Sequence, residues 1–373
     1  MLPTIFTGQG ASYSEAILAL SDGTVFNGVS IGADGSCVAE LVFNTALSGH
    51  QELITDPSYA EQIVVFTYPH IGSTGVNSHD SESNGTQING LVIRDCPPIT
   101  SNFRSEQSLP DYLRANGIVA ISGVDTRMLV RILRDKGKQS ACIMVGGNSE
   151  EAIAMARAHE GKLHNPTPSY TETTVFEPTS TTDEKTKHIV AIDFGIKNSA
   201  ISYLTSRGCK VTVLPNSSDI AQITKLAPDA LYISGGAGQA NSNSAGLDTL
   251  QQLLETNIPL FAVGYGAQLL AVALGASVSP LEVGNHGINH PVQNVETGRV
   301  YISCQKQDFQ INKGSLPKNL KPEFVSLFDG SLQGFSVIGK PIMATQFYPE
   351  GAPGPSDLTH IIDQFFDLTA SNS

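Results

Sequence analysis

The sequence predicts an α/β protein in which a β-rich N-terminal domain precedes an α/β domain with a largely parallel sheet. Three observations indicate this arrangement. Residues 14–145 form short alternating or β-rich runs separated by Gly, Asp-Gly and Pro. Residues 164–187 are rich in Pro, Thr, Ser and Glu without apolar periodicity, which is typical of a linker. From residue 188 onward, apolar strands alternate with helical patterns, as in a βαβ fold.

The domain boundaries follow from these changes of pattern. A chain of 373 residues suits two or three domains. We expect the first domain over residues 1–163, a linker over 164–187 and the second domain over 188–373. Two helices should close the first domain. Thr126–Gly137 carries Leu129, Ile132 and Leu133 at helical spacing, and a second helix is expected over Glu150–Glu160.

The second domain reads as alternating strands and helices. We predict a strand over 188–195, a helix over 197–208, a strand over 209–215, a helix over 218–228 and a strand over 230–236. Ile258–Val278 is long enough to cross a bilayer and carries no charge, but Pro and Gly interrupt it. We interpret this segment as a strand, a glycine turn and an apolar helix. In the final helix, Phe365 and Phe366 are expected to pack against the sheet.

Composition excludes several kinds of partner. The chain has 22 Lys+Arg against 35 Asp+Glu and a net charge of −13, which repels nucleic acid and anionic membranes. Its five cysteines are odd in number, widely spaced and never paired as C-x-x-C, which indicates reduced thiols without a disulfide or zinc site. The N-terminus has no basic segment typical of a signal peptide. We expect a cytoplasmic protein that binds no metal and no cofactor.

Two glycine-rich loops follow strands of the second domain, where parallel sheets place their chemistry. Gly235–Gly238 follows one strand, and its backbone N–H groups would be able to approach a ligand or an oxyanion. Gly264 follows another strand and precedes an apolar helix, as in a nucleophile elbow, which forces its central residue into a strained conformation. Glycine adopts that conformation readily but has no side chain with which to attack a substrate.

These segments belong to a wider resemblance. From end to end the chain resembles the small, glutamine-hydrolysing subunit of carbamoyl-phosphate synthetase. The matching strings of the first domain are SDGTVFNG, ELVFNTALSGHQELITDPSYAEQIVVFTYPHIGSTGVN, GLVIRDCPPITSNFR and GIVAISGVDTRMLVRILRDKG, and those of the second are VAIDFGIKNS, VGNHGINHPV, SLFDGSLQGF and YPEGAPGPSD. The resemblance implies a class I glutamine amidotransferase domain, in which a cysteine attacks the glutamine amide, a histidine activates the cysteine and a glutamate orients the histidine.

The chain departs from the family at the reacting positions. The elbow motif of the family is Gly-x-Cys-x-Gly-His-Gln, and in this chain Gly264 stands at its cysteine position. The family's Gln-Gly-His-Pro-Glu string corresponds to residues 346–350 of this chain. Tyr348 stands at its histidine position, and Glu350 matches its glutamate. A tyrosine, with an ordinary pKa of about 10, is a poor base at neutral pH. The resemblance therefore predicts that the nucleophile and the general base are lost, while the orienting glutamate remains.

The rest of the pocket is altered in part. The family's Asn-Gly-Pro-Gly-Asp oxyanion loop reads Gly-Gly-Ala-Gly-Gln at residues 235–239, and its Gln-Asn-His-Gly-Phe string reads Gln-Lys-Gln-Asp-Phe at 305–309. The Lys306 side chain would be able to fill the place of the substrate's backbone carboxylate or amine. By resemblance, the substrate-binding positions are Ser58, Gly236, Gly238, Tyr265, Gln268, Lys306, Asp308 and Phe309.

Alternative chemistry has little support in the sequence. Cys304, directly before the string at 305–309, is the other cysteine that lies nearest to these motifs. A strand cysteine lacks the helix N-terminal field that lowers a reactive thiol's pKa. His286 and His290 are four residues apart, yet Gly287 and Pro291 disfavour a helix that would present both to one metal. By resemblance they lie in a structural loop beside the active site. The pocket is then either vestigial or re-purposed for another ligand, and we favour the first.

Three functions are consistent with these residues. The first is a pseudo-amidotransferase that docks on a synthetase large subunit, which then makes carbamoyl phosphate from free ammonia. The second is a stand-alone binding or regulatory protein that uses the altered cleft for glutamine or another small ligand. The third is an active glutaminase with an unorthodox nucleophile. Family membership would connect the chain to pyrimidine or arginine biosynthesis, and the sequence does not choose between them.

Overall fold

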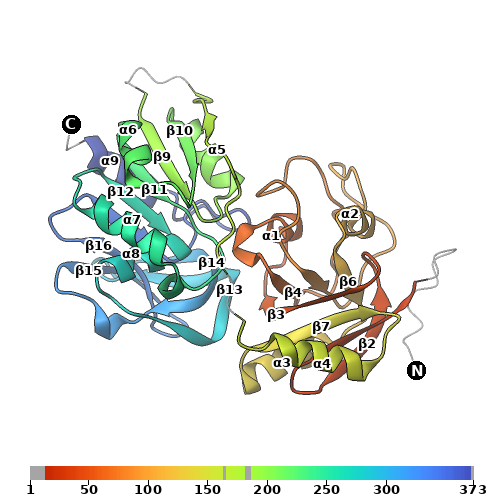
Figure 1. The fold of residues 1–373 in the computed structure, drawn as a ribbon. Helices are drawn as coiled ribbons and strands as arrows, with labels where there is room; N and C mark the ends of the chain where they lie inside the picture. Colours follow the sequence, from red (N-terminus) through yellow and green to blue (C-terminus); the bar gives the residue numbers. More distant parts are fainter. Residues whose placement is uncertain (1–12, 163–164, 181–185, 371–373) are drawn as a thin grey trace. The chain divides into compact units, whose positions relative to one another are not determined.

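The computed structural model describes residues 13–162, 165–180 and 186–370. The chain divides into two compact units, Met1–Lys162 and Leu163–Ser373, which are coloured from red to yellow and from green to blue in Figure 1. The expected boundary at residues 163 and 164 lies outside the described residues. The segment expected as a linker, 164–187, contains a short strand, because Val175 and Phe176 favour extended backbone and an edge strand was available for pairing.

The first unit is built on a closed barrel, which leaves no free sheet edge. Its strands follow one another around the barrel in the order β1-β2-β6-β5-β4-β3-β7. The pairs among β3, β4, β5 and β6 are parallel, and the other pairs are antiparallel. The bounds of the strands are β1 Glu15–Leu20, β2 Val25–Ser30, β3 Ser36–Asn44, β4 Gln62–Phe66, β5 Gly90–Val92, β6 Val119–Ser122 and β7 Gln139–Val145.

The two 11-residue helices of the described first unit begin at side-chain caps. The two helices predicted from the sequence are confirmed as α3 Thr126–Lys136 and α4 Ser149–His159. Asp125 accepts a hydrogen bond from the backbone N–H of Met128 at 3.0 Å, and Asn148 accepts one from Glu151 at 2.8 Å. The remaining helices of the described unit are α1 His50–Ile54, η1 Pro57–Tyr59 and α2 Leu109–Ala115.

The second unit contains one mixed sheet, and its α/β class is confirmed. Among the described residues the sheet has ten strands in the order β14-β13-β15-β16-β17-β12-β11-β9-β10-β8. The strands β10, β9, β11, β12 and β17 are parallel neighbours, whereas antiparallel pairing joins the strands on both sides of this block. The strands are β8 Thr174–Phe176, β9 His188–Asp193, β10 Lys210–Pro215, β11 Ala230–Ile233, β12 Leu260–Val263, β13 Val278–Asn294, β14 Val300–Ile311, β15 Leu320–Ser326, β16 Leu332–Val337 and β17 Ile342–Thr345.

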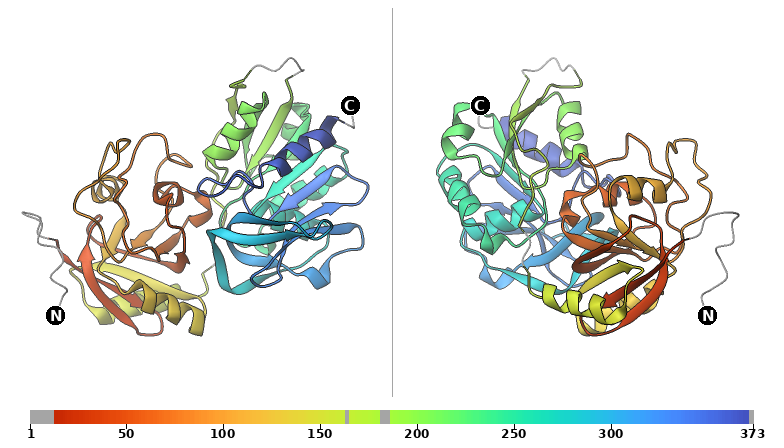
Figure 2. Two further views of the ribbon diagram at one scale, coloured as in Figure 1. Left: turned by 180° about the vertical axis from the view of Figure 1, so that it is seen from behind. Right: turned by 45° about the vertical axis from the view of Figure 1, so that its right-hand side comes forward.

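Helices cover both faces of the parallel block, so its strands are buried on both sides. Alternate residues of β9 show this, since Val190 packs with α6, α7 and α8, while Ile189 packs with α5 and α9. Phe365 of α9 is 1% exposed and Phe366 is partly buried against the same core, as predicted. Figure 2 shows α9 in dark blue across the sheet from behind. The helices are α5 Asn198–Ser206, α6 Ile220–Lys225, η2 Ala240–Ser242, α7 Ser244–Leu254, α8 Tyr265–Ala273, η3 Lys313–Ser315 and α9 His360–Ala370.

The apolar segment Ile258–Val278 forms β12, a turn at Gly264 and α8, which confirms the strand, turn and helix expected there. Within the described parts of the chain, no helix has the length and apolar character needed to span a bilayer. The carboxyl ends of β9, β11 and β12 lie side by side in the sheet and lead into Phe194, Ser234 and Gly264. These three strand ends position the candidate site.

Candidate functional site

The turn between β12 and α8 has the geometry of a nucleophile elbow. Gly264 has φ 55° and ψ −118°, a conformation that a residue with a side chain adopts only under strain. Its N–H donates to the carbonyl of Thr345 at 2.8 Å, and its carbonyl accepts from Gln268 at 3.2 Å as α8 begins. The elbow therefore persists, but no side chain projects from its tip.

The Tyr348 ring fills the space in front of this elbow. Tyr348 is 2% exposed, and its backbone N–H donates to the carbonyl of Cys304 at 2.9 Å. A β-carbon at position 264 would lie 2.7 Å from the Tyr348 hydroxyl oxygen and 3.0 Å from Cζ. A β-carbon at position 235 would lie closer still to the same hydroxyl. The tyrosine is thus accommodated because both Gly235 and Gly264 lack side chains.

Two buried lysines flank the tyrosine ring. The ammonium nitrogen of Lys197 lies 5.0 Å from the ring centroid of Tyr348, and that of Lys306 lies 4.9 Å from it. Both are distances at which a cation and an aromatic ring attract each other. Lys306 is 4% exposed, so its side chain lies in the interior, and its expected place in the substrate pocket stays a prediction.

Glu350 is engaged by one of these lysines. Its Oε1 lies 3.0 Å from the Lys197 ammonium, which also donates to the carbonyl of Gly351 at 3.0 Å. The two side chains are only 2% and 1% exposed. A buried charge is costly unless an opposite charge and hydrogen bonds compensate it, so each side chain requires the other. Lys197 was not singled out from the sequence; a lysine between a buried strand and a helix was the available signal.

The other predicted binding positions fall into separate groups. Gln268 donates to the carbonyl of Phe309 at 3.2 Å, which brings these two positions together one helical turn beyond Gly264. Asp308 Oδ1 instead lies 3.2 Å from Nε2 of His286. Gly236 and Gly238 have φ values of 156° and 111°.

Two of the predicted positions have local structural roles. The ring centroid of Tyr265 lies 5.4 Å from that of Phe194, and its hydroxyl accepts from Asn243 at 3.1 Å. Burial raises the pKa of Tyr265 to about 12. Ser58 lies in η1 of the first unit, where its N–H donates to Asp56 at 2.8 Å. Its expected part in substrate binding therefore stays a prediction.

The string that contains His286 and His290 is part of β13, not a loop as expected, because it pairs with β14 around register shifts. Burial, with a contribution from His286, lowers the pKa of His290 to about 4. In the described part of the chain, no three or more His, Cys, Asp or Glu side chains are grouped so that they could hold a metal ion. Cys304 is 1% exposed in β14 and packs in the same core as Tyr348.

Comparisons with known proteins agree across both units. The family model "Carbamoyl-phosphate synthase small chain, CPSase domain" matches residues 18–143, and "Glutamine amidotransferase class-I" matches residues 190–368. The chain is 45% identical over 370 residues to the carbamoyl phosphate synthase small chain of Vibrio cholerae, covering 95% of this chain and 98% of that protein. It is 44% identical over 371 residues to that of Pseudomonas putida, covering 95% and 98%.

Substituting Gly235→Ala should test the close packing of Tyr348. The added methyl group would collide with the tyrosine ring, so we expect the free energy of unfolding to fall by about 1–3 kcal/mol. In a Tyr348→Ala background the same substitution should cost much less. Urea denaturation of the wild type, Gly235→Ala, Tyr348→Ala and the double variant measures the loss of stability in each background. Gly314→Ala is the control, because no atom lies within 4 Å of its added carbon. Equal losses for Gly235→Ala and Gly314→Ala would contradict the packing argument.

The buried His290 should make stability depend on pH. Its pKa is about 4 in the folded protein and 6.5 ordinarily, so the unfolded chain binds the proton first as pH falls. We expect the free energy of unfolding to decrease between pH 6.5 and pH 4, by roughly 1.4 kcal/mol per pH unit from this group. His290→Gln should flatten the profile in urea titrations, whereas His79→Gln, at an exposed position, should not. Parallel profiles for both variants would exclude His290 as the source.

Proposed function

The chain belongs to the carbamoyl-phosphate synthase small-chain family, and from this premise we propose that it is a pseudo-amidotransferase. It docks on a synthetase large subunit without hydrolysing glutamine, and the large subunit makes carbamoyl phosphate from free ammonia. The activity serves pyrimidine or arginine biosynthesis in the cytoplasm. The net charge of −13 disfavours nucleic acid and anionic membranes as partners.

The packing of Tyr348 against Gly264 carries this proposal. Amide transfer from glutamine needs a side-chain nucleophile and a base within hydrogen-bond reach of it. Gly264 supplies no nucleophile, and the tyrosine hydroxyl lies where a cysteine side chain at that position would begin. The elbow conformation alone has no catalytic use. A cysteine could return to position 264 only if the tyrosine side chain were also replaced.

The same packing argues against an open cleft that waits for another ligand. Three positions of the former reaction centre now fit one another, since Tyr348 requires glycine at both 235 and 264. Lys306 adds a second buried side chain to the same volume. A site used as a ligand sensor would need space that these side chains occupy. We therefore favour a filled, vestigial pocket over a re-purposed one.

The alternative of an unorthodox nucleophile centres on Cys304. This residue belongs to β14 and is 1% exposed, so neither an elbow nor a helix N-terminus projects its thiol toward a substrate. Its side chain packs with apolar residues of the sheet core. These features favour a structural role.

Ammonia release from glutamine tests the proposed function directly. We expect no glutaminase activity above the buffer rate for the purified protein, alone or with the large subunit. The complex should form carbamoyl phosphate with ammonium as the nitrogen source and not with glutamine. Fluorimetric ammonia assays and coupled phosphate release measure the two reactions.

Two variants sharpen this experiment. Gly264→Cys with Tyr348→His restores both reacting groups without the steric conflict of the single Gly264→Cys change, so its ammonia release should exceed that of either single variant. Cys304→Ser should leave the wild-type result unchanged. A wild-type glutaminase rate that disappears in Cys304→Ser would overturn the pseudo-amidotransferase proposal and identify the nucleophile.

A further inference from the structure

Four Asn-Gly dipeptides occur in the sequence, and all of them lie in the first unit. Their asparagines are Asn27, Asn84, Asn89 and Asn116. In such a dipeptide the backbone nitrogen of the glycine can attack the side-chain carbonyl carbon of the asparagine, because glycine has no side chain that hinders the approach. On sequence alone the four dipeptides have the same reactivity. The fold places each of them in a different backbone and hydrogen-bond environment.

Two of the dipeptides are held by strands of the barrel. Asn27 and Gly28 lie in the middle of β2, where both are paired with β1. Asn89 donates from its backbone N–H to the carbonyl of Gln62 at 2.8 Å, and Gly90 then begins β5. Strand pairing fixes an extended backbone, so the glycine nitrogen can reach the side-chain carbon only after the pairing opens locally.

The third dipeptide ends helix α2. The side-chain amide of Asn116 donates to the carbonyl of Tyr112 at 2.8 Å, and its backbone N–H donates to the same carbonyl at 3.1 Å. The N–H of Gly117 donates to the carbonyl of Arg114 at 3.1 Å. Both reacting groups are therefore engaged by the helix, and these hydrogen bonds must break before the two groups can meet.

The dipeptide Asn84-Gly85 lies in neither a helix nor a strand. Asn84 is exposed, and within the described residues its side chain makes no hydrogen bond. The N–H of Gly85 donates to the carbonyl of Ser83 at 2.9 Å, a contact confined to this turn. The space around the Gly85 α-carbon is open, since an added β-carbon would meet only Oδ1 of Asn116, at 4.0 Å. The Asn84 side chain can therefore approach the Gly85 nitrogen without disrupting a helix or a strand.

The chain on both sides of this turn is held by the end of α1. The hydroxyl of Ser83 donates to the carbonyl of Thr55 at 2.6 Å. The N–H of Gln87 donates to the carbonyl of Ile54 at 2.9 Å. These contacts fix the two ends of a short exposed turn that carries Asn84.

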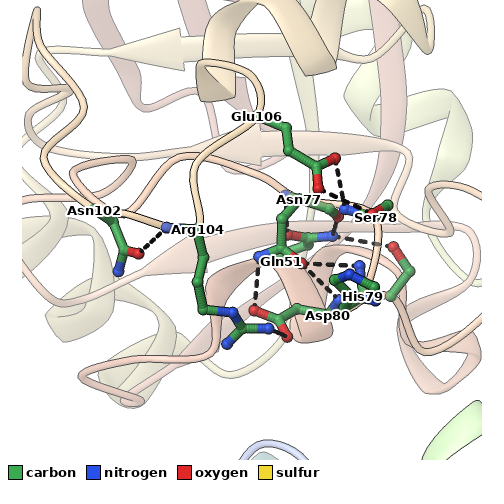
Figure 3. A network of polar contacts seen from close by, with 9 residues as sticks. Gln51, Asn77, Ser78, His79, Asp80, Asn102, Arg104 and Glu106 are labelled. Atoms are coloured by element: carbon green, nitrogen blue, oxygen red, sulfur yellow. Dashed lines mark hydrogen bonds and ion pairs between the residues drawn. The ribbon is translucent and has the colours of Figure 1, made fainter.

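A polar network anchors the same loop further upstream. Gln51 of α1 donates to the carbonyl of Asn77 at 2.6 Å and accepts from its N–H at 2.9 Å. The side-chain amide of Asn77 donates to Asp80 at 2.8 Å, and Asp80 forms an ion pair with Arg104. Figure 3 shows this network. The Asn77 amide is thus engaged on all sides, in contrast to that of Asn84.

We propose that Asn84 is a modification site at which the chain deamidates. The backbone nitrogen of Gly85 attacks Cγ of Asn84, the bond from Cγ to the side-chain nitrogen breaks, and ammonia leaves with the proton of the Gly85 nitrogen. The product is a succinimide ring. Water then opens the ring at one of its two carbonyl carbons, which gives aspartate or isoaspartate. The reaction needs no partner and does not depend on the proposed function.

The modification changes the turn in charge and in length. A carboxylate replaces a neutral amide, which adds negative charge to a chain whose net charge is already −13. In the isoaspartyl product the backbone runs through the former side chain and gains a methylene between Ser83 and Gln87, which α1 holds in place. An enzyme that methylates isoaspartyl carboxylates would find its substrate on an exposed turn.

Peptide mapping by mass spectrometry, after incubation of the purified protein, tests this site. We expect deamidation at Asn84 to be about tenfold or more faster than at Asn27, Asn89 or Asn116, because each of these must first open locally. Asn84→Gln should remove most of the acidic form that ion-exchange chromatography resolves, since glutamine closes the larger ring slowly. Asn27→Gln is the matched control, because Asn27 is an exposed asparagine of the same dipeptide in a strand, and it should leave the acidic form unchanged.

Isoaspartyl methyltransferase with labelled S-adenosylmethionine gives an independent readout. We expect more label on the incubated wild type than on incubated Asn84→Gln. Equal labelling of the two proteins would contradict isoaspartate formation at this residue.

The same peptide mapping in urea separates the effect of the fold from that of the sequence. In the unfolded chain we expect the four asparagines to deamidate at similar rates. A preference for Asn84 that urea removes would support the proposal. Equal rates at the four sites of the folded protein, or a faster reaction at any of the other three, would overturn it. An Asn84 that reacts in urea and stays unmodified in the folded protein would overturn it as well.

Discussion

The packing of the Tyr348 ring against the backbone of Gly235 and Gly264 determines what this site can do. Interiors of proteins are close-packed, so a ring of this size can enter only where other side chains are missing. Both glycines supply that space, one after β11 and one at the elbow after β12. The substitutions at the three positions therefore depend on one another. Under the proposed function, loss of the nucleophile and gain of the tyrosine would form one packing change.

The buried charges around the ring explain why part of the family pattern persists. Glu350 lies 3.0 Å from Lys197, and both side chains are almost completely buried. Removal of either would leave a charge in a low-dielectric interior, which is strongly unfavourable. The ion pair with Lys197 thus gives the glutamate a structural role that needs no histidine to orient. The presence of Glu350 in this chain is consequently weak support for catalysis.

The two units have different relations to function. In the second unit, strand ends and an elbow remain in place, but their central volume is filled. The first unit contains a closed barrel, and in the segment between its β5 and α2 Phe103 is 97% exposed. The loss of the chemical step that we propose would leave association with a large subunit as the role of this chain. The family fold is compatible with the proposed loss of catalysis, because binding surfaces and reaction centres occupy different residues.

Local patterns in the sequence determined most of the secondary structure and the identity of the residues at the elbow. Helical spacing located α3 and α4, strand and turn residues located the βαβ order, and the motif at Gly264 located the turn between β12 and α8. Only the tertiary structure showed that Tyr348 fills the space between Gly235 and Gly264, and that Lys197 neutralises Glu350. Pairing also decided that residues 174–176 form a strand and that His286 lies in β13. Periodicity and turn chemistry act between near neighbours, whereas packing and ion pairing depend on segments that only the complete fold brings together.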